Sequence, residues 1–251
     1  MNSYNATNSE PVSKISKDIF ENLKSNFFIR KILECLHKKK SLEIVKYNKN
    51  IKQRMNLNIK DYKEYAEKYS SIEIEIKLSK TGFRRFININ KENKLYFHIY
   101  YNHNKEEEIK REYIEENENI ETIGIIIDYQ VKSFRYLFYF CDRIESFCFK
   151  QFFRNNINDM SHMFHNCISL KELDISNFNS DNVINLGEMF RECFRLEKIN
   201  LSKLNTINVT DFERMFYSCD SLKELDLSYF NTSKVTDMGS MFNKCVSLEK
   251  I

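Results

Sequence analysis

Five cysteines recur at a fixed interval, and thiols of this kind can form disulfides or bind metal. Each lies 26 residues after the one before, at Cys141, Cys167, Cys193, Cys219 and Cys245. Stacked copies of such a repeat would bring neighbouring thiols within disulfide range, whereas zinc sites normally use ligands at short C-x-x-C-like spacing, which the sequence lacks. Because free cysteine behaves as a small apolar residue, we favour a ladder of buried thiols, with disulfides and metal as the alternatives.

A pair of histidines, His162 and His165, precedes Cys167 at a spacing that could place both rings on one helical face. The matching positions of the next repeats carry Glu188 with Arg191, and then Arg214 with Tyr217. Because these types are typical of a solvated surface, the histidines are expected to be surface residues and not metal ligands.

No other pattern points to catalysis. The chain has 5 His and 4 Gly in 251 residues, too few glycines for a phosphate-cradling loop, and no recognised nucleophile or metalloprotease motif. The 39 basic and 36 acidic residues nearly cancel, which argues against a dedicated nucleic-acid binder. We expect no enzyme activity, no cofactor, no metal and no nucleic-acid partner.

The same 26-residue step links whole columns of apolar residues. Each repeat reads M-x-x-M-F-x-x-C-x-x-L-x-x-L-x-L, as from Met160 to Ile175. The alternation of Leu173 and Ile175 predicts a short strand, and the spacing of Met160, Met163 and Phe164 predicts a helical or 3-10 turn. One repeat cannot cover its own apolar face, so neighbouring repeats are expected to stack.

The phrases LKELDLSYFNTSKVTD (Leu222–Asp237) and MGSMFNKC (Met238–Cys245) resemble the BspA-type leucine-rich repeats. The resemblance covers residues 120–251 and implies an α/β leucine-rich-repeat solenoid, with a parallel sheet and short helical or 3-10 turns, used for protein binding or adhesion. We expect this solenoid over 119–251, after an N-terminal α+β cap region. Ile120 to Ile125 repeats the strand spacing and is interpreted as a shortened first repeat.

Two kinds of polar column accompany the predicted strands. The charges alternate in sign from repeat to repeat, as in Glu145, Lys171 and Glu197, which predicts cross-strand pairs that fix the register. A second column is small and polar, and we take it as the candidate partner-binding face, with a merely solvated face as the alternative: Asp174, Ser176, Asn200, Ser202, Asp226 and Ser228.

The first half of the chain follows other patterns. Residues 1–14 are polar and predicted to be disordered, and 15–118 form a helical and then a β-strand region. Helices are expected over 15–36, 42–55 and 59–69, strands over 72–78, 86–89 and 95–101, and a short helix or a connector over 106–118. The strands are expected to pack beside the first repeat and shield its edge.

Leu23–Leu57, with the phrase LEIVKYNKNI from Leu42 to Ile51, resembles an F-box. This resemblance implies an adaptor that links a bound target to a ubiquitin-ligase scaffold. The alternative is a helical cap for the repeats.

Together these patterns predict a non-catalytic module that binds other proteins. A BspA-type surface adhesin or antigen and an F-box-like adaptor are the alternatives. Met1 to Lys17 is polar and no apolar run approaches the roughly 18 residues of a spanning helix, so we expect a cytoplasmic chain without membrane insertion, with the cell surface as the alternative. The last apolar layer (Met238, Met241, Phe242 and Leu248) predicts continuation into further repeats or self-association.

Overall fold

The computed structural model describes residues 25–27, 29, 49–54, 70–80, 85–115 and 117–251. The chain divides into two compact units, Met1–Tyr69 and Ser70–Ile251. In the first unit, helix α4 (Lys49–Arg54) carries the buried Ile51 and lies within the second predicted helical stretch. The predicted tail lies outside the described residues, as do most of the other two predicted helices and of the F-box-like segment.

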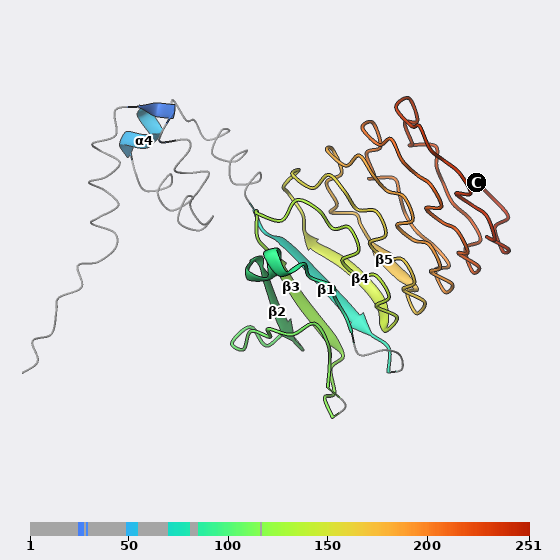
Figure 1. Ribbon diagram of the computed structural model, residues 1–251, viewed down its shortest axis with the longest axis horizontal. Coiled ribbons are helices and arrows are strands. Elements are labelled where there is room, and N and C mark those ends of the chain that lie inside the picture. The colour runs from blue at the N-terminus through green and yellow to red at the C-terminus, as the bar shows by residue number, and fades with distance from the viewer. Residues whose placement is uncertain (1–24, 28, 30–48, 55–69, 81–84, 116) are drawn as a thin grey trace, which may run out of the picture. The chain divides into compact units, whose positions relative to one another are not determined.

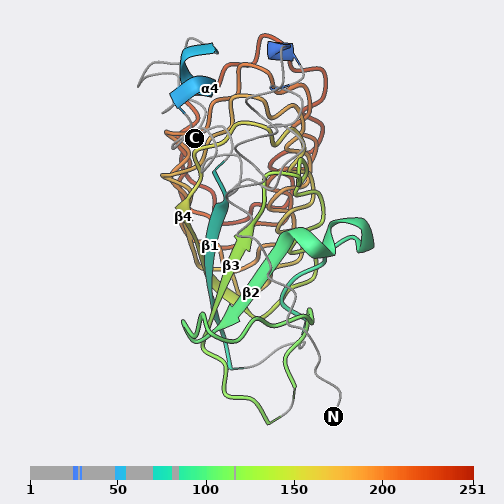
Figure 2. The same cartoon turned by 90° about the vertical axis from the view of Figure 1, so that its left-hand side faces the viewer.

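The second unit contains a five-stranded sheet in the order β2-β3-β1-β4-β5 (Figure 1). Its neighbours pair antiparallel except for β4 and β5, which run parallel. A 3-10 helix, Lys91–Tyr96, leads directly into β2. Figure 2 looks onto the end where β2, β3 and β1 lie side by side. The strands are β1 (Ile72–Leu78), β2 (Phe97–Tyr101), β3 (Thr122–Ile127), β4 (Ile144–Gln151) and β5 (Glu172–Asp174).

Alternating burial explains the strands that the sequence predicted. In β1 the isoleucines are buried and the intervening glutamates are half-buried, which is the period of two that a pleated strand imposes. The prediction of strands over 72–78 and 95–101 is confirmed, although the second begins at Phe97. The prediction over 86–89 is wrong: Phe86 and Ile87 are buried in succession, and only a single bridge, Arg85 to Tyr113, forms there.

Two further segments are settled by the strand pairing. The described part of 106–118 is a connector with single bridges at Ile109 and Tyr113, so the helical alternative is wrong. Ile120–Ile125 is not a shortened first repeat, because β3 is antiparallel to both β1 and β2. On its other side β1 pairs with β4, which agrees with the expectation that the early strands cover the first edge of the repeats.

The predicted α/β leucine-rich-repeat solenoid is wrong. The sheet is small and mixed, with one parallel pair, and none of residues 119–251, all of which the structure describes, is helical. The predicted helical turn is excluded by residues such as His162 (φ 56°) and Asn166 (φ 61°), whose left-handed backbone cannot belong to a right-handed helix. Equivalent positions of successive repeats are joined by isolated parallel bridges at Ser133, Asp159, Asn185, Asp211 and Asp237.

The eight residues that follow each bridged position form what we call the turn segments, which are 134–141, 160–167, 186–193, 212–219 and 238–245. Alternate N–H groups donate to the next turn segment, as His162 N does to Gly187 O (2.9 Å) and Phe164 N to Met189 O (2.9 Å). Other N–H groups bond three residues back, as Cys167 N does to Phe164 O (3.0 Å). This pattern satisfies buried backbone without a helix or a continuous sheet.

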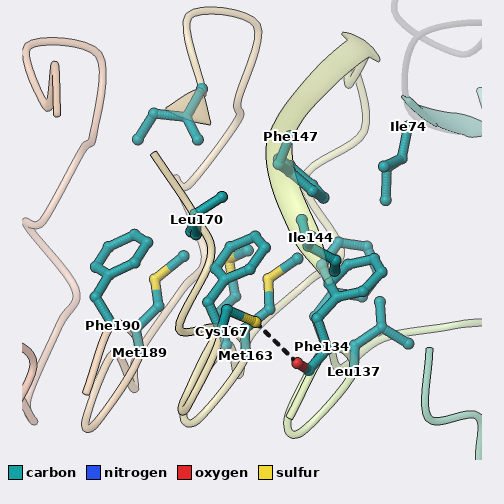
Figure 3. Close-up of a cluster of buried hydrophobic side chains, with 14 of the residues drawn as sticks. Ile74, Phe134, Leu137, Ile144, Phe147, Met163, Cys167, Leu170, Met189 and Phe190 are labelled. Carbon is teal, nitrogen blue, oxygen red and sulfur yellow. Dashed lines mark hydrogen bonds between the residues drawn. The ribbon is translucent and has the colours of Figure 1, made fainter. Parts of the chain in front are cut away.

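Aromatic rings fill the space inside the turn segments (Figure 3). The rings of Phe138, Phe164, Phe190 and Phe216 are stacked, with successive centroids 5.6, 5.7 and 5.5 Å apart. Such rings each remove a large apolar area from water, so this column is a main source of stability. Methionines such as Met163 and Met189 lie beside it and are also buried.

We predict that Phe190→Ala lowers the free energy of unfolding by about 3–5 kcal/mol, because it leaves a cavity between two stacked rings. Urea unfolding followed by circular dichroism measures this change. Phe153→Ala is the matched control, since Phe153 is 55% exposed and its removal should cost far less. Equal losses in the two variants would contradict a column of rings as the core.

Candidate functional site

The six residues of the candidate partner-binding face are all exposed. Each Asp or Asn accepts a hydrogen bond from the N–H two residues on: Ser176 N to Asp174 Oδ1 (2.9 Å), Ser202 N to Asn200 Oδ1 (3.0 Å) and Ser228 N to Asp226 Oδ1 (2.9 Å). These bonds form Asx turns, which redirect the chain where each predicted strand ends. The Asp and Asn side chains of this face therefore have a structural role.

Hydrogen bonds also set the charge state of the two aspartates. Donation by the Ser176 side chain and backbone lowers the pKa of Asp174, and donation by Ser228 lowers the pKa of Asp226 in the same way. Both carboxylates consequently stay ionised well into the acid range and keep the Asx turns intact.

A hollow of about 750 Å³ opens beside these turns. Asn200, Ser202 and Asp226 line it, whereas Asp174, Ser176 and Ser228 lie outside its lining. Apolar side chains contribute as well, among them the half-buried Leu173 and Ile199. Half of the predicted face is therefore brought together in one concave surface.

The hollow lies where backbone pairing lapses. We call 171–176, 197–202 and 223–228 the strand segments. Lys171 N bonds to Glu145 O (2.9 Å), and pairing returns at the Glu224–Lys250 bridge. Within the described strand segments, no backbone hydrogen bond joins 197–202 to either neighbour. The predicted parallel sheet is interrupted here, and the space between segments becomes accessible.

Opposite charges still span the strand segments, as their alternation predicted. Lys171 Nζ lies 2.6 Å from Glu145 Oε1, and Lys198 Nζ lies 3.9 Å from Glu224 Oε1. These exposed pairs contribute little stability individually, on the order of 0–1 kcal/mol. Their more direct effect is to border the hollow with both signs of charge.

A second cluster lies on the turn segments, where His162, His165 and Glu188 converge. Glu188 Oε2 is 3.2 Å from Nδ1 of each histidine, and the two Nδ1 atoms are 3.5 Å apart. The prediction that both histidines are surface residues is wrong for His165, which is only 7% exposed, while His162 is half-buried. Two imidazoles and a carboxylate are groups that can hold a metal ion or share protons.

Aromatic residues of the preceding turn segment hold the imidazoles. The Tyr136 ring stacks on His162, with centroids 4.4 Å apart and planes 20° from parallel. Tyr139 meets His165 edge-on at 5.0 Å. Arg135 lies over the Tyr136 ring at 5.1 Å. These contacts restrict both rings and limit water around them.

Burial lowers the pKa of His162, with the Glu188 carboxylate acting in the opposite direction. Burial likewise lowers the pKa of His165, and the neighbouring Arg191 guanidinium lowers it further. The folded cluster therefore favours neutral imidazoles over imidazolium. The negative charge of Glu188 is balanced by Arg191, whose Nη1 lies 3.1 Å from Glu188 Oε2.

The cysteine column faces the core and not this cluster. Cys141, Cys167, Cys193 and Cys219 are buried and free, so the prediction of buried thiols is confirmed for these four, whereas Cys245 is free but half-buried. Each of the last three thiols donates to a phenylalanine carbonyl of the repeat before, as Cys193 Sγ does to Phe164 O (3.2 Å) and Cys167 Sγ to Phe138 O (3.1 Å, dashed in Figure 3). Burial raises the pKa of these thiols, which keeps them protonated.

The sequence contains the signal for the histidine cluster, although comparison of residue types alone missed it. Glu188 lies 26 residues after His162, and Glu192 lies 26 residues after Asn166. Positions one repeat apart are neighbours in space, so the histidines should have been compared with the acidic residues of the next repeat. No comparable signal in the sequence shows that His165 is buried and His162 half-buried.

Residues 132–251 match the family model described as "Mycoplasma protein of unknown function, DUF285". The match begins one residue before Ser133, where the row of bridged positions starts. No curated protein and no solved structure shows significant similarity to the chain. The BspA-type resemblance stays a prediction, because this family description carries neither that likeness nor a function.

Within the described part of the chain, none of the helices combines the length and the apolar character that crossing a bilayer requires.

We predict that the free energy of unfolding falls as the pH drops below about 6.5, the usual pKa of histidine. The pKa values of His162 and His165 are lower in the folded state than in the unfolded chain. As the pH falls, the unfolded chain therefore takes up protons first, so acid favours unfolding. In the double variant His162→Gln/His165→Gln, the free energy of unfolding should fall less over the same drop in pH.

Urea unfolding in EDTA-containing buffer at about pH 7.5 and about pH 5.5 makes the comparison. His103→Gln is the control, because its side chain is 68% exposed. An unchanged pH dependence in the double variant would show that these two rings do not cause it.

Proposed function

We propose that the chain is a non-catalytic module that binds another protein through the hollow beside the strand segments. The observation that carries this proposal is the lapse of backbone pairing at 197–202, which leaves a concave surface with an apolar component. Binding sites combine apolar area with a few placed polar groups, and Leu173 and Ile199 with Asn200 and Ser202 supply both.

The charges of the hollow favour a particular kind of partner. Lys171, Lys198 and Lys250 alternate with Glu224 and Asp226 around it. A polyanion such as nucleic acid gains most from a surface of one sign, which this hollow does not offer. The partner that fits is a protein segment with apolar side chains to contact Leu173 and Ile199, flanked by charges of both signs.

The other candidate functions rest on the sequence. The F-box-like stretch 23–57 is largely outside the described residues, and the surface-adhesin alternative depends on the BspA-type resemblance. Both stay predictions. The hollow favours the protein-binding module, since it supplies a surface on which partner contacts can be placed.

A matched pair of substitutions tests the hollow. Ser202 and Ser233 both follow an asparagine in an Asx turn, with N–H to Oδ1 distances of 3.0 Å in each case, but only Ser202 lines the hollow. We expect Ser202→Arg to weaken binding at least about tenfold, which corresponds to about 1.4 kcal/mol, because the long side chain fills the site. Ser233→Arg should leave it unchanged.

Partners identified by quantitative affinity purification from the source cells would be purified, and their affinity measured by calorimetry against the full chain and both variants. Equal affinity of the wild type and Ser202→Arg would overturn the proposal. So would the failure of the wild-type chain to enrich any protein over Ser202→Arg.

We further propose that the chain is cytoplasmic and not displayed on the cell surface. Support comes from the column of free thiols, since unpaired cysteines in quantity are typical of a reducing compartment. Protease added to intact cells should leave the chain uncut while cleaving a known surface protein. Cleavage of the chain in that experiment would favour the surface alternative.

A further inference from the structure

The histidine cluster has a geometry that hydrogen bonding alone does not require. Nδ1 of His162, Nδ1 of His165 and Oε2 of Glu188 form a triangle with sides of 3.2, 3.2 and 3.5 Å. Oε2 has two lone-pair positions and already accepts from Arg191 Nη1 at 3.1 Å, so one imidazole donor would be enough to satisfy it. Here two nitrogens and one oxygen face a common point from two adjacent turn segments.

The triangle has the dimensions of a tetrahedral zinc site. Zinc binds imidazole nitrogen and carboxylate oxygen at about 2.0–2.2 Å, which places adjacent ligand atoms of a tetrahedron about 3.3–3.6 Å apart. The sides of the triangle match this spacing closely, so an ion could be bound with only small movements. Two histidines and one glutamate are also a familiar set for zinc with an open fourth position.

We propose that His162, His165 and Glu188 bind a divalent transition metal ion of the zinc class. Three protein ligands leave the fourth position to water. The site lies on the turn segments and is separate from the hollow on the strand segments, so the inference goes beyond protein binding.

Surrounding contacts orient the ligands as metal sites require. Glu192 Oε2 lies 3.6 Å from Nε2 of His165, the nitrogen that faces away from the triangle. Its carboxylate is held in turn by Asn166 Nδ2 (2.9 Å) and Arg191 Nε (3.1 Å). A carboxylate behind a ligating histidine fixes the ring and strengthens it as a ligand. Stacking on Tyr136 orients His162 in the same sense.

Nearby positive charge does not close the site. Arg191 Nη1 contacts Glu188 Oε2 at 3.1 Å, but a carboxylate oxygen has two lone-pair positions, so it can accept this bond and bind an ion together. Arg214 Nη1 approaches the other oxygen, Oε1, at 3.7 Å. The charged groups around the triangle are balanced, with Glu188, Glu192 and Asp159 on one side and Arg135, Arg191 and Arg214 on the other.

The test uses the full chain, stripped of metal with EDTA and dialysed, and titrated with Zn²⁺ in a calorimeter. One equivalent should bind. Co²⁺ serves as a spectroscopic probe, and its visible bands should appear without the near-ultraviolet charge-transfer band of a thiolate ligand. That pattern would assign nitrogen and oxygen ligands and exclude the cysteines.

Variants locate the ion. His165→Gln and Glu188→Gln should each weaken Zn²⁺ binding by at least about 100-fold, and Glu192→Gln by the about 10–100-fold typical of a residue behind a ligand. Glu188→Gln keeps the size and most hydrogen bonds of the side chain, and circular dichroism checks that each variant is folded.

His98→Gln is the matched control. His98 also has two carboxylate neighbours, but Glu108 Oε1 (2.8 Å) and Asp128 Oδ2 (3.3 Å) lie on opposite ring nitrogens and cannot share one ion with it. This variant should bind zinc like the wild type. No zinc binding by the wild-type chain, undiminished binding by His165→Gln or Glu188→Gln, or a thiolate band with Co²⁺ would each overturn the proposal.

Discussion

Backbone hydrogen bonds between successive turn segments are the constraint on which the rest of the second unit depends. For every other N–H group to reach the next repeat, the chain must enter left-handed conformations twice in each turn segment, as at His162 and Asn166. Such conformations cost energy for residues other than glycine, and they persist because the surrounding bonds fix them. Phe164, which lies between these two residues, and Cys167, which follows the second, then face inward and fill the core.

The same constraint decides where polar chemistry can occur. Positions one repeat apart are adjacent, so a functional group on one turn segment meets the side chain 26 residues away. His162 thus meets Glu188, and Asn166 meets Glu192. Because the backbone bonds of the turn segments do not depend on which side chain occupies an outward position, Arg214 can stand where His162 does without changing the fold. A cluster of polar side chains can therefore form in one pair of adjacent repeats and be absent from the others.

The features that could be predicted from the sequence are those set by which positions are neighbours, either one repeat apart or alternating along a strand. The register of the repeats predicted the buried thiols and the Lys171–Glu145 pair, and alternation predicted β1. Conformation was not predictable in the same way. Apolar residues three apart are compatible with a 3-10 turn and with left-handed turns, and the isoleucines of β3 would suit a parallel or an antiparallel strand equally. For the sites, three of the six predicted face residues line the hollow, while His165 is covered by Tyr139 and Phe140 of the preceding repeat.

The turn segments and the strand segments differ in how much of their backbone is bonded, and this difference separates stability from recognition. Turn segments are tied to one another along the whole row of repeats, and their stacked rings exclude water. The strand segment 197–202 is anchored instead by buried Leu196 and Leu201 and by its Asx turn. A segment held by side chains and a turn can leave space beside its backbone without loss of the core. The interruption that makes the leucine-rich-repeat sheet the wrong description is therefore also what creates the hollow.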